Sequence, residues 1–548
     1  MIQKFSLRLA RLSLTIALVG MGTLFISPSA HAAEHVYTIG TTQLPADILP
    51  LKQYSGQTNI LRNLLFPPIL KVQTDGRVRC VLCKDVPIVE SRKGESGTYI
   101  ISMELKKDLR WGDGSEITAE DVKFTLETMA KSSYPPGHHP ILPIKRIEFD
   151  KEQKRKITLI LKHRRSDAFQ LFAISLLPSR REKEVATLIA DPAKALDVLK
   201  QPDFAYGPYR IAHTTDKTWQ LVSNEKSDWE QKPDQPVDLR FFNDLNELRE
   251  AMKSSAIDQS DEMSWTSFET VKSLWPDLNS KYAVSGTPSS DLKVLLINLH
   301  SPLLVNPQLR QALYYALNRD ELNKAGYQGL AELGTGLLSE GFAKRLELKR
   351  PVGFDKKLAN QILDLSGWAK GADGIRSYEG QSFVVKLSCP AGRLNESWLA
   401  TVKSDLLSLG IKLEVDHPDG SDYMKKVVSE RRFKDLACAT WSLPPLSIPN
   451  NIFHSLAIPN RENSYFGANY SAWDQHVVDR LLDNMLRETN LHHFTRQFGR
   501  LEKQFLSDLP GLPLVFEPKV TLTLKTPVLM PSEELSRVLQ NPTAPKKL

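Results

Sequence analysis

The residues with the clearest chemical potential are Cys80 and Cys83, which form a C-x-x-C motif. This spacing binds metal ions or exchanges electrons in many intracellular proteins. The sequence contains no second C-x-x-C motif and no thioredoxin-like pattern around this one. We therefore expect either a local disulfide or two packed thiols at this motif.

Two histidine pairs, His138–His139 and His492–His493, are the other candidates for metal binding. Adjacent side chains point in different directions, and no third ligand lies near the first pair, so neither pair predicts a metal site. The sequence also lacks a G-x-S-x-G motif, an H-E-x-x-H motif and a phosphate-binding glycine loop. We expect no catalytic residue, no metal and no cofactor, and an exported hydrolase or metalloprotein is the less favoured alternative.

Length and composition are those of an ordinary soluble protein. The chain has 548 residues, more than one hydrophobic core usually serves, so two or three domains are expected. Hydrophobic residues make up 41% and charged residues 25%, a typical globular balance. The formal net charge of +7, from 71 basic and 64 acidic residues, is a mild excess spread along the chain. It does not indicate a nucleic-acid partner.

Residues 1–33 have the pattern of a cleaved export signal: a basic start, an apolar run and a small-residue cleavage site. These parts are Lys4, Arg8 and Arg11, residues 12–26, and Ala30–Ala32. The apolar run is too short for a comfortable membrane-spanning helix. The first cysteine, Cys80, lies far from the cleavage site, so a lipid anchor is not expected. We predict a soluble protein, not a lipoprotein, in the periplasm of a double-membraned bacterium.

A tight turn followed by a capped helix is predicted between Leu109 and Met129. Trp111–Gly114 reads W-G-D-G, and its glycines suit a tight turn. Thr118 then begins a helix, because its hydroxyl can cap the first free N–H groups and Asp121 completes a capping box. The apolar side chains of this helix fall on one face, at Val122, Leu126 and Met129.

Other elements follow the same local rules. A hairpin is expected from strands at residues 144–149 and 156–161, and a strand–helix–strand unit over residues 383–415. A later helix is expected to start with a capping box formed by Ser471 and Asp474.

Several spaced segments form an ordered set along the chain. They are Trp111–Val122, Gly207–Tyr209, Asn306–Leu322, Phe354–Trp368 and Leu509–Phe516. In this order they resemble the motifs of extracellular solute-binding proteins of family 5, the oligopeptide-, dipeptide- and nickel-binding receptors of ABC importers. The resemblance runs from about Val36 to about Pro518.

The resemblance implies an α/β fold of the bilobal periplasmic-binding-protein type. Two α/β lobes are joined by a hinge, the first lobe carries an extra subdomain, and hinge closure buries a ligand between the lobes. The expected divisions are a signal peptide at 1–33, a discontinuous lobe I at 34–60, 195–290 and 505–548, an inserted subdomain of lobe I at 61–194, and lobe II at 291–504.

The implied function is that of a periplasmic substrate-binding protein of an ABC transporter. Such a receptor binds a peptide or peptide-like solute and delivers it to the permease subunits in the inner membrane. We expect a monomer without enzymatic activity. Two alternatives keep the receptor fold, one with a non-peptide ligand and one with a sensor or chaperone role.

The resemblance also implies a ligand-binding wall formed by Thr440, Trp441 and Ser442, because the family's strand ending in tryptophan delivers groups to the ligand. Trp441 has a second interpretation as a core residue, since most aromatic side chains serve packing. We further expect Gln43, Arg393 and Tyr465 among the ligand-binding residues. The position where peptide-binding members carry an aspartate, the partner of the peptide's α-amine, is Pro444 here.

The missing aspartate bears on the ligand, because an unpaired ammonium in a closed cleft is costly. Either another carboxylate reaches the amine or the ligand has no ammonium there. A modified peptide, a cell-wall fragment or another non-amine solute therefore competes with an oligopeptide.

Cys389 and Cys438 each lie at an end of a predicted strand in the second lobe, and we expect them to lie close together. If the two are adjacent, they can form a disulfide in the oxidising periplasm. Two separate buried thiols are the alternative.

Overall fold

The computed structural model describes residues 36–42, 63–92, 97–131, 144–149, 152–190, 201, 204–226, 229, 233–349, 352–391, 393–488 and 490–526. The predicted signal peptide and the predicted site residue Gln43 lie outside these ranges. Within them, no helix combines the length and the apolar character that a membrane crossing needs.

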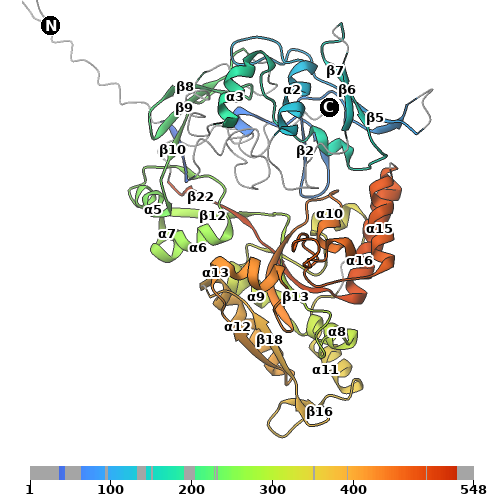
Figure 1. Cartoon of the computed structure of the whole chain (residues 1–548). Helices are drawn as coiled ribbons and strands as arrows, with labels where there is room; N and C mark the ends of the chain where they lie inside the picture. The colour runs from blue at the N-terminus through green and yellow to red at the C-terminus, as the bar shows by residue number, and fades with distance from the viewer. Residues whose placement is uncertain are drawn as a thin grey trace, which may run out of the picture. The chain divides into compact units, whose positions relative to one another are not determined.

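Lobe I is built on a seven-stranded sheet. In sheet order its strands are β12 (Tyr282–Thr287), β22 (Lys519–Leu524), β11 (Gln259–Ser260), β1 (Tyr37–Thr41), β10 (Val237–Phe241), β9 (Thr218–Ser223) and β8 (Tyr209–Thr214). The central strand β1 is buried along its whole length and pairs in parallel with β10 and β11. Strands β8, β9 and β10 continue the sheet as antiparallel neighbours (Figure 1). The helices of this part are α5 (Leu245–Lys253), α6 (Trp265–Leu274) and α7 (Leu278–Lys281).

The inserted subdomain carries a four-stranded antiparallel sheet and a small hairpin. The sheet contains, in order, β4 (Val89–Ser91), β5 (Tyr99–Glu104), β7 (Lys156–Leu161) and β6 (Ile144–Phe149), and the hairpin pairs β2 (Leu70–Val72) with β3 (Val78–Cys80). Around them lie α2 (Ala119–Ala130), α3 (Glu182–Ala190) and the short 3₁₀ helices η2 (Ala168–Phe172) and η3 (Ser179–Arg181). The pairing of β6 with β7 confirms the predicted hairpin.

The start of α2 confirms the predicted capping box. The backbone N–H of Thr118 donates to Asp121 Oδ2 at 2.9 Å, and Trp111 Nε1 donates to the same oxygen at 3.3 Å. The second oxygen, Oδ1, accepts hydrogen bonds from the backbone N–H and the hydroxyl of Ser179, both at 2.8 Å. One buried carboxylate therefore joins the W-G-D-G turn, the helix start and a segment far along the chain.

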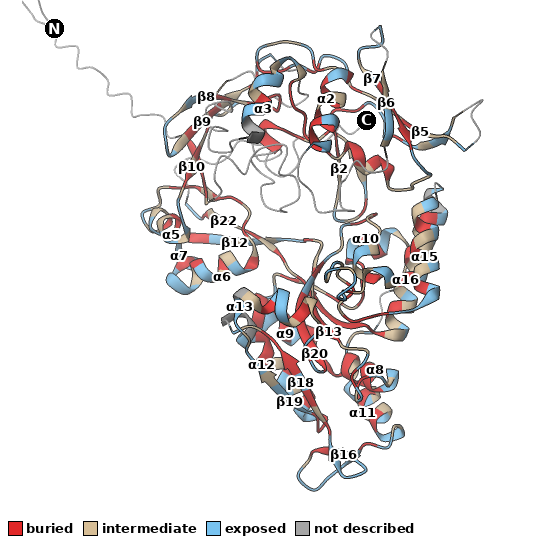
Figure 2. Cartoon of the chain, in the orientation of Figure 1, coloured by how far each residue is buried: buried red, intermediate tan, exposed pale blue. Residues whose placement is uncertain are grey.

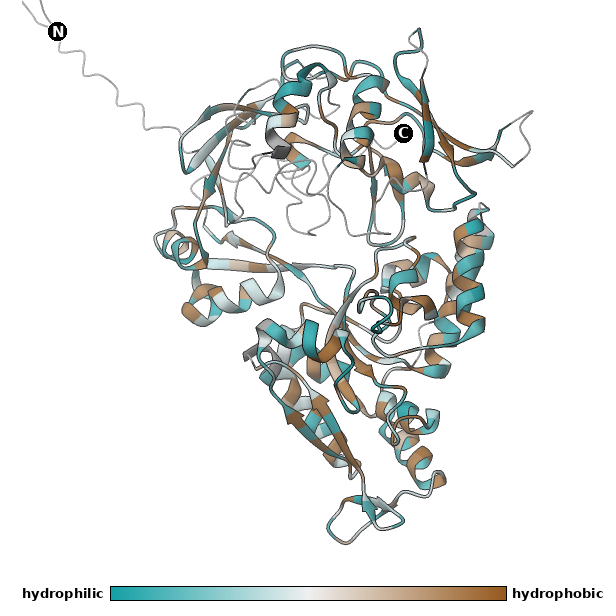
Figure 3. Ribbon diagram, viewed as in Figure 1, coloured by the Kyte–Doolittle hydropathy of each residue, from teal (hydrophilic) through white to brown (hydrophobic). Residues whose placement is uncertain are grey.

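Lobe II is built on a six-stranded sheet. In sheet order its strands are β14 (Glu332–Leu333), β21 (Gly511–Phe516), β13 (Asp291–Ile297), β20 (Leu436–Ser442), β18 (Val384–Ser388) and β19 (Lys412–Asp416). The buried and hydrophobic residues of this sheet stand out in Figures 2 and 3. Strands β18 and β19 pair in parallel on either side of α12 (Arg393–Ser408) in sequence, which confirms the predicted strand–helix–strand unit.

Helices and short elements complete lobe II. They are α8 (Pro307–Ala316), α9 (Arg319–Tyr327), α10 (Glu340–Arg345), α11 (Lys356–Leu365), α13 (Gly420–Asp422), the π-helix η5 (Tyr423–Ser429), α14 (Asn450–Phe453), the 3₁₀ helix η6 (Ser455–Ala457), α15 (His476–Arg487) and α16 (Leu491–Asp508). A separate three-stranded sheet contains β15 (Ala369–Lys370), β16 (Arg376–Tyr378) and β17 (Gln381–Ser382).

The chain passes between the two large sheets twice. Strand β12 of lobe I leads into β13 of lobe II, and β21 of lobe II leads back into β22 of lobe I. The two linkers are hydrogen-bonded to each other, because Glu517 N donates to Asp291 O at 2.8 Å and Ser289 Oγ donates to Glu517 O at 2.5 Å. They form the hinge. Pairing with β13 places β21 in the lobe II sheet, so the return crossing lies beyond the expected boundary at residue 504, which falls within α16.

The predicted capping box of Ser471 and Asp474 is wrong, because α15 begins only at His476. Trp473, between the two expected capping residues, is buried, and its Nε1 donates to Asp508 Oδ2 at 2.9 Å. The residues before this indole form a turn, in which Ala472 N donates to Asn469 O at 3.1 Å, and the helix starts only after it.

Both cysteine pairs are joined by disulfides. Cys80–Cys83 closes a local loop with a sequence separation of 3, whereas Cys389–Cys438 has a separation of 49 and ties the end of β18 to β20. The expected closeness of Cys389 and Cys438 is confirmed. At the C-x-x-C motif we expected either a local disulfide or two packed thiols, and the local disulfide is present.

Removing the longer disulfide should destabilise lobe II more than removing the shorter one destabilises the inserted subdomain. For Cys389→Ser/Cys438→Ser we expect a loss of about 2–4 kcal/mol in the free energy of unfolding, because the bond restricts a long loop in the unfolded chain. Urea denaturation without reductant measures it. Cys80→Ser/Cys83→Ser is the matched control, and equal losses from the two pairs would contradict the loop-length argument.

Candidate ligand-binding site

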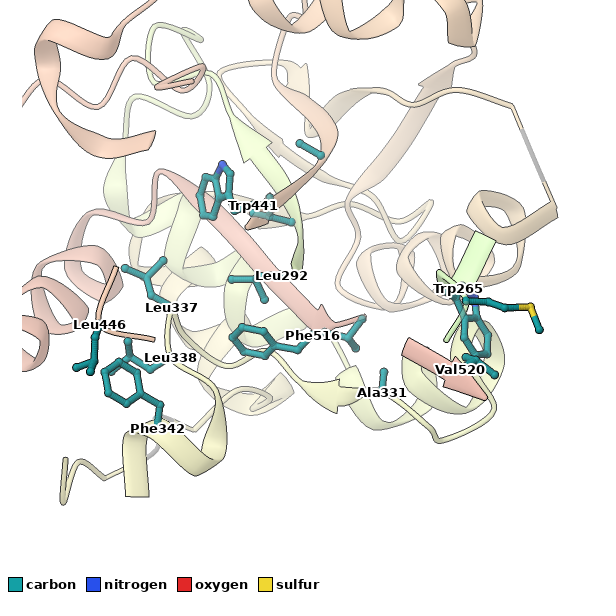
Figure 4. Packing of buried hydrophobic residues seen from close by; sticks show 14 of the residues in the cluster. Trp265, Leu292, Ala331, Leu337, Leu338, Phe342, Trp441, Leu446, Phe516 and Val520 are labelled. Atoms are coloured by element: carbon teal, nitrogen blue, oxygen red, sulfur yellow. The ribbon is translucent and has the colours of Figure 1, made fainter. Parts of the chain in front are cut away.

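Lobe II contains a narrow apolar pocket beside the hinge. Its lining residues are Ser290, Leu337, Leu338, Ser339, Phe342, Leu443, Pro444, Pro445, Ser447, Pro449, Phe453, Phe498, Leu501 and Phe516. None of these side chains is charged, and the serine hydroxyls are the polar side-chain groups. Leu337, Leu338 and Phe342 gather on one side of Phe516 (Figure 4). Its interior of about 20 Å³ has room for one small group, and the lining favours an uncharged, apolar one.

Three segments position this lining. Ser290 belongs to the hinge linker before β13. Ser339 is the N-cap of α10, where its hydroxyl accepts a hydrogen bond from Phe342 N at 3.4 Å. The third segment is the loop of residues 443–449 after β20, in which prolines supply neither a charge nor a backbone N–H.

The end of β20 presents its three predicted site residues on two faces. Thr440 and Ser442 are exposed, whereas Trp441 is 4% exposed and packs its ring against Phe453 and Phe505 at centroid distances of 5.1 and 6.0 Å. Strand alternation produces this split. Trp441 therefore occupies the core, the second interpretation of its sequence position, while Thr440 and Ser442 stay accessible.

None of the predicted site residues in the described ranges is among the residues that line this pocket, and Thr440, Trp441 and Ser442 end directly before its lining residue Leu443. Arg393 begins α12. Tyr465 lies in a loop with a positive φ of 57°, and its backbone N–H donates to Asn460 O at 2.7 Å. Their roles in ligand binding stay predictions.

A charged cluster lies on the Thr440 face of β20. The Thr440 hydroxyl donates to Glu517 Oε2 at 3.3 Å, and Tyr327 donates to Oε1 of the same carboxylate at 3.0 Å. Lys293 Nζ lies 3.9 Å from Glu517 Oε1. Burial, and then the Glu517 charge, raise the pKa of Tyr327 well above its ordinary value, so this hydroxyl stays protonated and remains a donor. Polar groups of lobe II are thus concentrated at the hinge residue Glu517.

Asp261 of lobe I is a buried carboxyl group that the sequence analysis missed. It follows β11, and the parallel neighbour β1 ends at Thr41. Asp261 and Thr41 therefore lie at the carboxyl ends of these strands, which is where open α/β sheets bind ligands. Its Oδ2 accepts a hydrogen bond from the Thr41 hydroxyl at 3.2 Å. Burial raises the pKa of Asp261 to about 7, with its side chain 4% exposed. The sequence feature that could have indicated this residue is a carboxylate directly after a short strand.

We expect the free energy of unfolding to fall as the pH rises from about 4 to about 7. The folded pKa of Asp261 is about 7 against an ordinary value of 3.8, so in this window the folded chain holds a proton that the unfolded chain has lost. Raising the pH therefore favours unfolding. Urea midpoints at several pH values measure the slope. Asp261→Asn should flatten it, and an unchanged slope in this variant would contradict the assignment.

No group of three or more His, Cys, Asp or Glu side chains in the described ranges is arranged to hold a metal ion.

A known protein family matches this chain over most of its length. The family described as bacterial extracellular solute-binding proteins, family 5, middle region, matches residues 89–457. The chain belongs to this family. The family 5 match covers the inserted subdomain from β4 onward, the hinge linker before β13 and the loop of residues 443–449, whereas β2 and β3 precede it.

This solute-binding protein is similar in sequence to two curated relatives. It is 24% identical to YejA of Escherichia coli K12 over 418 residues, which span 65% of this chain and 64% of YejA. It is 22% identical to the oligopeptide-binding protein AppA of Bacillus subtilis over 465 residues, 82% of this chain and 80% of AppA.

Similar solved structures confirm the bilobal α/β fold. NikZ of Campylobacter jejuni in complex with Ni(L-His) aligns with a TM-score of 0.61 at 20% identity, covering 89% of this chain and 94% of NikZ. AppA of Bacillus subtilis in complex with a nonapeptide aligns with a TM-score of 0.57 at 19% identity, covering 93% of this chain and 98% of AppA. At these identities the likeness establishes the fold.

Proposed function

We propose that this family 5 protein is the periplasmic receptor of an ABC importer. It binds a peptide or peptide-like solute between its lobes, without catalysis, and delivers it to the permease subunits in the inner membrane. The export signal read from the sequence would place it in the periplasm as a free monomer. Family membership and the oligopeptide-binding relative AppA support this proposal.

The observation that carries the ligand class is the absence of charge around the pocket at residues 443–449. Peptide-binding relatives are expected to hold the α-amine of the ligand with an aspartate at the position of Pro444. Here the position is a proline, its neighbours are Leu443 and Pro445, and no lining side chain can pair with an ammonium. The ligand therefore presents an uncharged group to this pocket, as an N-blocked or otherwise modified peptide does.

Native mass spectrometry of the mature protein, purified from the periplasm of its own bacterium, tests this function. We expect a co-purified solute whose end is neutral, such as an acylated or cyclised peptide. A mixture of unmodified peptides with free N-termini would contradict the ligand class. Turnover of peptide or ester substrates by the pure protein, lost on a point substitution, would contradict the receptor function itself.

A further inference from the structure

A tight turn of the inserted subdomain, Thr74–Gly76, connects β2 and β3. Its conformation is fixed locally, because Gly76 N donates to Gln73 O at 2.8 Å and Arg77 N donates to Asp75 Oδ1 at 3.0 Å. The side chains of Arg77 and Asp75 also form an ion pair at 2.6 Å. Gly76 has a φ of +77°, which glycine adopts without strain. The turn is thus held in one conformation by bonds among its own residues and their neighbours.

This turn contacts the N-terminal end of α10 in lobe II. The Ser339 hydroxyl donates to Thr74 O at 3.1 Å. A Cβ atom added at Gly76 would lie 2.6 Å from Cδ2 of Phe342 and 3.5 Å from Cβ of Pro445. Ser339, Phe342 and Pro445 all line the apolar pocket. The turn therefore packs directly behind the pocket wall, at a distance that leaves no room for a side chain.

A second contact joins the inserted subdomain to the same pocket. Gln170 of η2 donates from Nε2 to Leu446 O at 3.0 Å, within the loop of residues 443–449. The two contacts thus hold α10 and the 443–449 loop from the same subdomain. The inserted subdomain therefore contacts both segments of lobe II that form this side of the pocket wall.

We propose that the Thr74–Gly76 turn is a latch whose Gly76 positions Phe342 and Pro445 on the ligand pocket when the lobes close. The inference rests on the proposed function, since it takes the pocket as the ligand site. Gly76 acts through Phe342 and Pro445, so it is a positioning residue. Any side chain at residue 76 would push Phe342 away and hold the lobes apart.

Cysteine trapping in the full mature chain tests the latch without a known ligand. A Cβ at Gly341 would lie 3.2 Å from Asp75 Cβ, a few tenths of an ångström short of disulfide geometry. Asp75→Cys/Gly341→Cys should therefore form a disulfide across the lobes on mild oxidation, detected by non-reduced peptide mapping. Asp75→Cys/Gly374→Cys is the control pair, because Gly374 faces open space. No bond in the first pair, or equal bonding in both, would overturn the latch.

Gly76→Ala in the trapping background should slow disulfide formation by about tenfold, the scale expected of an overpacked contact. Gly374→Ala is the matched control for backbone strain, because its φ is +78° and no atom lies within 4 Å. Adding Phe342→Ala to Gly76→Ala should restore trapping, which a purely local effect of the alanine would not allow. Failure of this rescue would overturn the role of Phe342.

The latch and the proposed function fail separately. Trapping with no solute recovered from the periplasmic protein would retain the latch and reject the receptor function. A recovered solute with no trapping would reject the latch alone.

Discussion

Replacing Arg319 with methionine is expected to lower the free energy of unfolding of lobe II by about 3–5 kcal/mol. The side chain is 2% exposed at the start of α9. Its Nε donates to Gly334 O at 2.9 Å and to Pro513 O at 2.8 Å. These carbonyl groups belong to different segments beside β14 and within β21, so one guanidinium joins them.

The same guanidinium satisfies three further carbonyl groups. Its Nη1 donates to the backbone oxygens of Tyr314, Leu317 and Gly353. Burial lowers the pKa of Arg319 to about 10, so the group remains charged at neutral pH. Methionine fills most of the volume but donates no hydrogen bond, which would leave these buried carbonyl groups without their donor.

Hydrogen exchange of the β21 amides, together with urea denaturation, measures this loss where it occurs. Arg496→Met is the matched control, because Arg496 lies on α16 with an exposed side chain and should change stability by less than about 0.5 kcal/mol. A loss below about 1 kcal/mol in Arg319→Met would show that water or neighbouring groups replace the guanidinium.

Replacing Pro444 with aspartate should shift binding toward peptides with a free α-amine by on the order of 100-fold. Pro444 lines a pocket that has no charged side chain, and it is exposed in the described structure. A carboxylate there would pair with an ammonium that the wild-type pocket leaves unpaired. The ratio of the Kd values of N-acetyl-trialanine and trialanine, measured by calorimetry on ligand-stripped protein, reports the shift.

Pro444→Asn is the matched control for this substitution, because it has the shape of aspartate without the charge. It should leave the ratio close to that of the wild type. Tighter binding of trialanine than of the acetylated peptide by the wild-type protein would mean that another carboxylate meets the amine. Asp261, the buried carboxyl group of lobe I, is then the first residue to substitute.

Elements defined by neighbouring residues were predictable from the sequence. The Thr118–Asp121 capping box and the hairpin of β6 and β7 were predicted and are present. The family motifs likewise predicted the bilobal fold. Each of these features depends on contacts between residues a few positions apart or on an ordered set of such segments, which the sequence displays directly.

Long-range burial decided the features that the sequence left open or predicted wrongly. The capping box at Ser471 failed because the fold buries Trp473 against Asp508 instead of starting a helix. Strand alternation in β20 shows that Trp441 and Thr440 face opposite ways, but only packing against Phe505 shows that the indole is the core side. Local patterns determine periodicity, whereas tertiary packing determines which face is covered.

The candidate site depends most on the tertiary structure. The sequence by itself determined the family, the order of the elements and the absence of an aspartate at Pro444. Only the folded chain brings the 443–449 loop, α10 and the hinge together around one uncharged pocket, and only it places the Thr74–Gly76 turn against Phe342. These contacts join residues hundreds of positions apart, and their geometry follows from how two sheets and an inserted subdomain pack, which no local pattern encodes.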